Sequence, residues 1–152
     1  MKKLLVILLA VILVLGLSAC GSGNVNWQDF KVDGETYKVG VNKDSGITIV
    51  ENTSVEYLLY FYKDGEKLLG SAASILTGSL ASVQQDMEKG GTLVEQRSDK
   101  NATYTIYKNN DKELETTYFV IVDFLDKDGF MSFETKGELE EIKEIYDVIS
   151  AK

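Results

Sequence analysis

The stretch Tyr118-Phe119-Val120-Ile121-Val122 decides the fold of this chain. Aromatic and β-branched residues favour extended backbone, and every side chain in the stretch is of one of these kinds. A strand with one solvated face would carry polar residues at alternate positions, and none occurs here. We therefore predict a strand over residues 114–125 that lies centrally in a sheet and is covered on both sides.

Shorter strands are predicted around this central strand, each bounded by turn residues. Asp64-Gly65 favours a tight hairpin between strands over residues 55–62 and 67–75. The turn Asp44-Ser45-Gly46 predicts that a strand over residues 47–50 returns against one over residues 36–41. Three further strands are expected over residues 92–96, 102–108 and 130–134.

The first predicted helix covers residues 80–89. One side of it carries three apolar side chains, namely Leu80, Val83 and Met87. Thr77 or Ser79 can cap its start, and Gly90-Gly91 is expected to end it in a left-handed conformation.

The second predicted helix closes the chain. Thr135 and Glu138 have the spacing of a capping box at its start. Its apolar stripe consists of Leu139, Ile142, Ile145, Tyr146 and Ile149. Together these elements predict an α+β fold: an antiparallel β-sheet built from hairpins, packed by an internal helix and a C-terminal amphipathic helix.

The N-terminal segment has the order of an export signal. Lys2 and Lys3 precede an apolar run over residues 4–15, and small or mildly apolar residues follow up to Ala19. The apolar run is shorter than the roughly 20 residues that a membrane-spanning helix needs. Cys20, the only cysteine of the chain, comes directly after this segment.

Leu17-Ser18-Ala19-Cys20 resembles the lipobox of bacterial lipoproteins. The resemblance implies cleavage between Ala19 and Cys20, a diacylglyceryl group on the Cys20 sulfur and an acyl chain on its amine. The alternative is an ordinary signal peptide followed by an unmodified cysteine. We expect a signal peptide over residues 1–19, a lipidated and flexible tether over 20–26, and one domain over 27–152 at the extracytoplasmic face of the cell membrane.

A second resemblance concerns the domain itself. Its element order, the hairpin Tyr62-Lys63-Asp64-Gly65-Glu66-Lys67 and the closing segment from Phe130-Met131-Ser132-Phe133-Glu134 to Leu139-Glu140-Glu141-Ile142 look like PsbP/Mog1-type domains. The resemblance covers about residues 27–150. It implies an assembly or binding factor and brings no catalytic residues with it.

Composition narrows the classes of function. The leader carries two lysines and no acid, so its removal changes the net charge from −8 to −10. Such an acidic surface opposes binding to nucleic acid. The chain has no histidine, which removes the commonest general base and the commonest transition-metal ligand. No Gly-rich phosphate loop and no serine-nucleophile motif occurs.

Two groups of residues are candidate sites. Tyr60, Tyr62 and Tyr107 are candidate ligand-facing aromatics that could stack on sugar rings or anchor a protein, with burial in the core as the favoured alternative. The acids Asp123, Asp126 and Asp128 gather before Gly129. A calcium loop aligned on that glycine places Phe124 and Thr135 where ligands are needed, so a polar turn is the better interpretation.

We therefore expect a non-enzymatic binding or assembly factor. Its expected partners are the membrane, through the lipid on Cys20, and an envelope protein or glycan, with no cofactor and no metal. A cell-wall glycan-binding module is one alternative. A small hydrolase that uses a pair of carboxylates, drawn from Glu138, Glu140, Glu141 and Glu144, is another.

Overall fold

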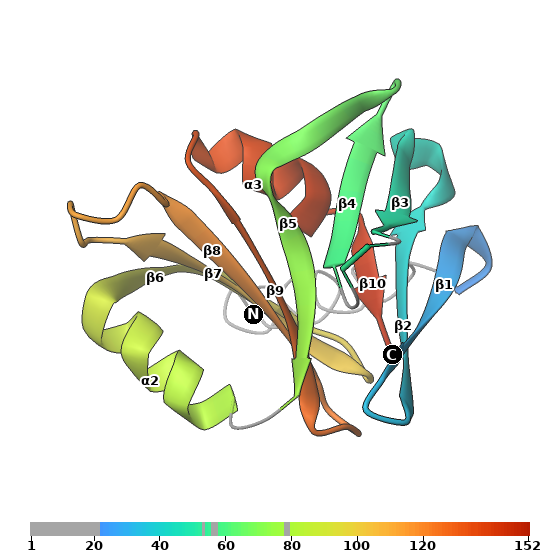
Figure 1. Cartoon of the computed structure of the whole chain (residues 1–152), viewed down its shortest axis with the longest axis horizontal. Helices are drawn as coiled ribbons and strands as arrows, with labels where there is room; N and C mark the ends of the chain where they lie inside the picture. The colour runs from blue at the N-terminus through green and yellow to red at the C-terminus, as the bar shows by residue number, and fades with distance from the viewer. Residues whose placement is uncertain (1–21, 53, 56–57, 78–79) are drawn as a thin grey trace, which may run out of the picture.

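A computed structural model describes residues 22–52, 54–55, 58–77 and 80–152 (Figure 1). Within these residues the fold is mostly antiparallel β-sheet with two α-helices. A three-stranded sheet has the order β1-β2-β10. Its strands are β1 Val25–Val32, β2 Glu35–Asn42 and β10 Ile149–Ala151.

A seven-stranded sheet forms the body of the molecule, in the order β3-β4-β5-β9-β8-β7-β6. Its strands are β3 Ile47–Glu51, β4 Leu58–Lys63, β5 Glu66–Thr77, β6 Gly91–Ser98, β7 Ala102–Asn109, β8 Tyr118–Phe124 and β9 Gly129–Thr135. The expected strands are thus present, although β8 begins four residues later than its predicted start at 114. All pairings in both sheets are antiparallel.

The prediction for the central strand is confirmed. β8 lies between β7 and β9. Val120 and Val122 are buried in the main core, while Ile121 is buried in a second cluster on the opposite face. A strand apolar on both sides is stable here because each face is covered by another layer.

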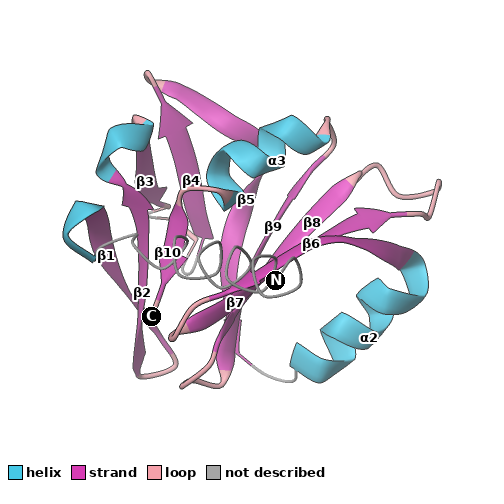
Figure 2. Ribbon diagram, turned by 180° about the vertical axis from the view of Figure 1, so that it is seen from behind, coloured by secondary structure: helices cyan, strands magenta, loops and turns pink. Residues whose placement is uncertain are grey.

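The two helices cover opposite faces of the large sheet (Figures 1 and 2). α2, Leu80–Gly90, packs its predicted apolar side on a cluster formed by Tyr107, Ile121 and Phe130. α3, Leu139–Tyr146, lies on the other face, where it shares the main core with the small sheet. Among the described residues, no helix is long and apolar enough to cross a bilayer.

The predicted pairing of residues 47–50 with 36–41 is wrong. β2 pairs with β1 and β10, and β3 pairs with β4. The chain passes from the small sheet to the large one through the 3₁₀ turn η2, Lys43–Ser45, and Gly46, whose φ is 70°. The alternation of apolar residues fits two facing sheets as well as one hairpin, because both arrangements bury the same side of each strand.

The first helix ends at the predicted glycines, but the left-handed conformation expected there is wrong. Neither Gly90 nor Gly91 has positive φ, and α2 runs directly into β6. Gly91 is needed for close approach, since a Cβ there would lie 2.7 Å from the Met87 carbonyl oxygen and 2.9 Å from that of Lys108. Thr77 donates its hydroxyl hydrogen bond to Asp33 at 2.5 Å. Ser79, the other predicted cap, lies outside the described residues.

The predicted capping box does not form. Thr135 ends β9, and its hydroxyl donates to Glu141 Oε2 at 2.8 Å. Glu138 makes no side-chain cap hydrogen bond. The apolar stripe is confirmed as far as Tyr146, but Ile149 belongs to β10 and the described chain ends as a strand.

A latch around Arg97 holds this final strand. Arg97 Nη2 donates to the carbonyl oxygens of Tyr146, at 2.7 Å, and Ile149, at 2.8 Å. Its guanidinium carbon lies 3.7 Å from the centre of the Tyr104 ring. The Tyr104 hydroxyl accepts from the Ala151 N–H at 2.8 Å and donates to Asp99 at 3.1 Å. Burial, together with the charge of Asp99, raises the pKa of Tyr104.

Candidate functional site

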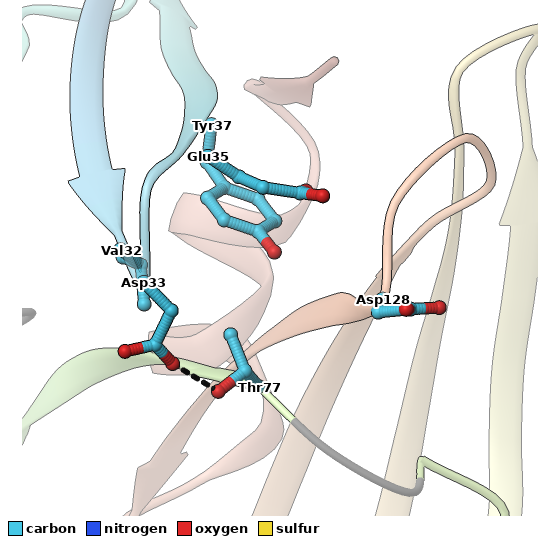
Figure 3. Close-up of a pocket in the computed structure, with 6 residues that line it drawn as sticks. All are labelled: Val32, Asp33, Glu35, Tyr37, Thr77 and Asp128. Carbon is cyan, nitrogen blue, oxygen red and sulfur yellow. Dashed lines mark hydrogen bonds between the residues drawn. The ribbon is translucent and has the colours of Figure 1, made fainter.

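An acidic pocket of about 500 Å³ lies where the small sheet meets the large one (Figure 3). Its lining residues are Val32, Asp33, Glu35, Tyr37, Thr77 and Asp128. They come from the end of β1, the β1–β2 turn, β2, the end of β5 and the β8–β9 turn. The pocket therefore joins the small sheet to the large one.

Turn geometry places the first acid of this pocket. Asp33 and Gly34 have φ values of 50° and 86°, which are typical of a two-residue hairpin with the right-handed strand twist. The turn carries Asp33 to the end of β5, where its carboxylate accepts the hydrogen bond from Thr77 (Figure 3). This bond fixes one wall of the pocket.

Tyr37 forms the floor of the acidic pocket. The residue is 0% exposed, and its ring packs edge-on against Phe124 with the centroids 5.0 Å apart. Its hydroxyl is buried, has no hydrogen-bond partner and is directed toward the pocket (Figure 3). Burial, followed by the negative charge of Glu35, raises the pKa of Tyr37.

Gly129 makes room for this hydroxyl. A Cβ at Gly129 would lie 2.3 Å from the Tyr37 hydroxyl oxygen, which is closer than atoms can approach. The glycine thus lets the β8–β9 turn close over Tyr37 and brings Asp128 to the rim. Lys127, in the same turn, places its Nζ 5.5 Å from the centre of the Tyr37 ring.

The lining groups set the chemistry of the pocket. Three carboxylates and two hydroxyls supply oxygen atoms only. No lysine or arginine in the described part of the chain forms an ion pair with Asp33, Glu35 or Asp128. Within the same described residues, no three acids gather closely enough to hold a metal ion.

For Tyr107, the favoured alternative of burial is confirmed, and the ring does not face a ligand site. Tyr107 is 6% exposed and lies under α2, and burial raises its pKa. Tyr60 and Tyr62 are half-buried on β4, and Asn52 donates to the Tyr60 hydroxyl at 3.0 Å. β4 and β7 are four strand spacings apart in the sheet, or about 19 Å. At this separation the three rings cannot form one binding platform. Moreover, α2 covers only the end of the face where Tyr107 lies.

The three acids near Gly129 do not converge either. Asp123 is half-buried on the same face of β8 as Ile121, and burial raises the pKa of its carboxyl. Asp126 is exposed, and only Asp128 lines the pocket. Two of the four candidate glutamates are engaged elsewhere: Glu141 accepts from Thr135, and Glu144 pairs with Lys63. None of the four lines the pocket.

Sequence reasoning missed Asp33, Glu35, Tyr37 and Thr77 as site residues. One local signal exists for Asp33, because Asp33-Gly34 is a hairpin dipeptide. The pairing of this turn with Thr77 and Asp128 has no local signal, since the three segments are far apart in the chain.

No family model matches this chain, and no curated protein or solved structure shows significant similarity to it. The resemblances to bacterial lipoproteins and to PsbP/Mog1-type domains gain no support from these comparisons and stay predictions. Cys20 and Ala19 lie outside the described residues.

The unpartnered hydroxyl at the pocket floor leads to a test by stability. Tyr37→Phe removes a buried polar atom that has no partner, so we expect the free energy of unfolding to rise by about 1 kcal/mol. Tyr104→Phe is the matched control: its hydroxyl has two partners, and we expect a loss of about 1–3 kcal/mol. Chemical denaturation of both variants measures the two shifts. A clear destabilisation by Tyr37→Phe would show that its hydroxyl is bonded within the protein.

Proposed function

We propose that this chain is a lipid-anchored, extracytoplasmic binding or assembly factor of the cell envelope and not an enzyme. The observation that carries the proposal is Leu17-Ser18-Ala19-Cys20 placed directly before the domain. β1 begins at Val25, two residues before the expected start of the domain at 27. The stretch between anchor and fold is thus very short.

Hydrogen bonds at the start of the described chain support a defined orientation of the domain on the membrane. Asn24 Nδ2 donates to Asn42 Oδ1 at 3.1 Å and to Asp44 Oδ2 at 2.6 Å. Lys43 Nζ donates to the Gly23 carbonyl oxygen at 3.2 Å. These bonds tie the start of the described chain to η2. A lipid on Cys20 could lie no further than about 18 Å from Val25 along the chain.

The acidic pocket lies at the opposite end of β1. The eight residues of this strand span about 26 Å, from the η2 end to the turn that carries Asp33. In Figure 1, η2 is at the upper right, and the β1–β2 and β8–β9 turns are at the lower edge. An anchor at Cys20 would therefore direct the pocket away from the membrane, toward envelope partners.

The mass of the native protein tests the anchor. Protein extracted from its own envelope should begin at Cys20 and carry diacylglyceryl and acyl mass on that residue. Intact-mass spectrometry with fragmentation of the N-terminal peptide measures both. A free Cys20 thiol in the extracted protein, or retention of residues 1–19 in all of it, would contradict the proposal.

A carboxylate-dependent hydrolase is the second candidate, because Asp33, Glu35 and Asp128 surround one pocket. Such an enzyme needs one carboxyl that stays protonated to act as the general acid. Among the described residues, burial raises the pKa of the Asp123 carboxyl, and Asp123 does not line the pocket. Binding therefore explains the pocket better. Release of reducing ends from peptidoglycan by the wild type, but not by Asp33→Asn, would reverse this preference.

A further inference from the structure

We propose that Trp27 contacts the phospholipid headgroup layer, with Lys43 and Lys152 beside it as donors to lipid phosphates. The contact is formed by one corner of the small sheet, at the end where the described chain begins. The inference rests on the proposed lipid anchor and adds a site of membrane contact to it. Tryptophan favours the membrane interface, because the indole has an apolar body and one polar N–H.

Strand alternation places Trp27 on the outer face of the small sheet. Phe30 and Val32 of the same strand are buried in the main core, so the odd-numbered positions of β1 point the other way. Trp27 is opposite Gly40 of β2, and Gly40 is opposite Ser150 of β10. The Trp27 side chain is half-buried there and keeps part of its surface in solvent.

Gly40 lets the indole lie against the sheet. A Cβ at Gly40 would be 3.0 Å from Trp27 Cε3 and 2.5 Å from Val25 Cγ1. These two apolar side chains therefore cover Gly40 and form a low apolar surface at the corner. The indole N–H makes no hydrogen bond to another described residue, and it is not buried. It can thus donate to a lipid oxygen.

Two lysines accompany the ring. Lys152 holds its Nζ 4.1 Å from the centre of the Trp27 ring, and its backbone pairs with that of Lys38. Lys43 lies in η2, where its Nζ donates to the Gly23 carbonyl oxygen at 3.2 Å. An ammonium has three N–H donors, so both lysines retain donors for phosphate oxygens.

Charge confines the contact to this corner. Without the leader the chain carries a net charge of −10, because the −8 of the full chain includes Lys2 and Lys3. A broad contact would bring many acids close to lipid phosphates. The acids of β1 and η2 are engaged within the protein: Asp29 pairs with Lys38, and Asp44 accepts from Asn24 at 2.6 Å.

The reach of the anchor fits the contact. A lipid on Cys20 lies within about 18 Å of Val25 along the chain. Trp27 is two residues further, or about 7 Å along β1. Lys31 is on the same face of the strand, about 13 Å beyond Trp27. A slight lean of the domain toward this face places Trp27 among the headgroups and leaves residue 31 outside them.

Intrinsic fluorescence tests the proposal without a label, because Trp27 is the only tryptophan of the chain. The lipidated protein is reconstituted into phosphatidylcholine vesicles that carry a nitroxide either on the headgroup or near the end of the acyl chain. We expect the headgroup nitroxide to quench about half of the Trp27 emission or more, and the deep nitroxide much less. Lys43→Gln combined with Lys152→Gln should reduce the headgroup quenching about twofold.

Trp27→Phe combined with Lys31→Trp is the matched control. It moves the single indole further from the anchor on the same face of the same strand, and headgroup quenching should fall severalfold. Lys100→Gln removes one positive charge in the β6–β7 turn, away from the corner, and should leave the quenching of Trp27 unchanged.

Intact mass of the same sample separates this inference from the anchor. Lipid mass on Cys20 without headgroup quenching of Trp27 overturns the contact and leaves the anchor standing. Equal quenching of an indole at residue 31, stronger quenching by the deep nitroxide, or a loss of quenching with Lys100→Gln also overturns it. So does an emission that changes with protein concentration in nitroxide-free vesicles, which assigns this face to a second copy. Absence of lipid on Cys20 overturns both claims.

Discussion

Cys20→Ser is expected to abolish lipid attachment completely. Serine offers a hydroxyl in place of the thiolate nucleophile that takes up the lipid. Two or more acyl chains hold a protein stably at about 0.8 kcal/mol per buried CH₂, so their loss removes the whole anchor. We expect the variant either as free protein or as a precursor that retains residues 1–19. Fractionation of the envelope followed by intact-mass measurement checks both outcomes.

Ser22→Ala provides the control for this experiment. Ser22 lies two residues after Cys20, outside the lipobox, and the substitution should change neither fractionation nor the lipid mass. A Cys20→Ser protein that fractionates like the wild type, with the mass changed only by the substitution itself, would contradict anchoring at this residue.

Deletion of residues 149–152 should cost about 5 kcal/mol or more of unfolding free energy. Ile149 and Ala151 are buried in the main core, and truncating one buried isoleucine alone costs about 2–5 kcal/mol. The deletion also leaves Arg97 and Tyr104 without backbone partners in β10. Such a loss is comparable to the whole stability of a small domain. We expect a largely unfolded protein by circular dichroism.

Graded variants separate this effect from a general sensitivity of the C-terminus. Ile149→Ala should lose about 2–5 kcal/mol. Lys152→Ala keeps the backbone bonds to Lys38 and removes only the ammonium over Trp27, so it should lose about 1 kcal/mol or less. A deletion variant with unchanged denaturation would show that β10 is dispensable and that the Arg97 latch does not hold the core.

Local sequence is sufficient to predict structure where the residues of one short segment determine its conformation. The hairpin at Asp64-Gly65 forms as predicted, with φ values of 51° and 83°. Leu59 and Phe61 are buried, and Tyr60 and Tyr62 are on the other side of the strand. The alternation of side chains along one strand fixes which residues share a face.

Pairings between distant segments could not be predicted in the same way. β10 has three residues, and its place beside β2 depends on Arg97 and Tyr104, which lie about 50 residues earlier. Ile149 fits the helical stripe that precedes it, so periodicity alone extended the helix through it. The acidic pocket depends on three separate turns and strand ends, and only the three-dimensional fold brings them together.

Tyr107 illustrates a further limit. Its strand position indicated the face of the sheet on which it lies. Whether that face is solvated depends on α2, which covers Tyr107 but not Tyr60. Amphipathic patterning thus identifies the faces of an element, but the cover on each face is decided by packing with other elements.

The most direct test of a lipid-anchored binding protein with an outward-facing pocket is a quenching measurement on liposomes. Lipidated Lys31→Cys and Lys43→Cys proteins, each labelled with a fluorophore at the introduced thiol, are compared in vesicles that carry a quencher on the lipid headgroup. Lys43 lies in η2, and Lys31 lies near the β1–β2 turn, about 20 Å away along the strand. We predict strong quenching at residue 43 and weak quenching at residue 31. Equal or reversed quenching, or none at either position, would contradict the proposed anchor and orientation.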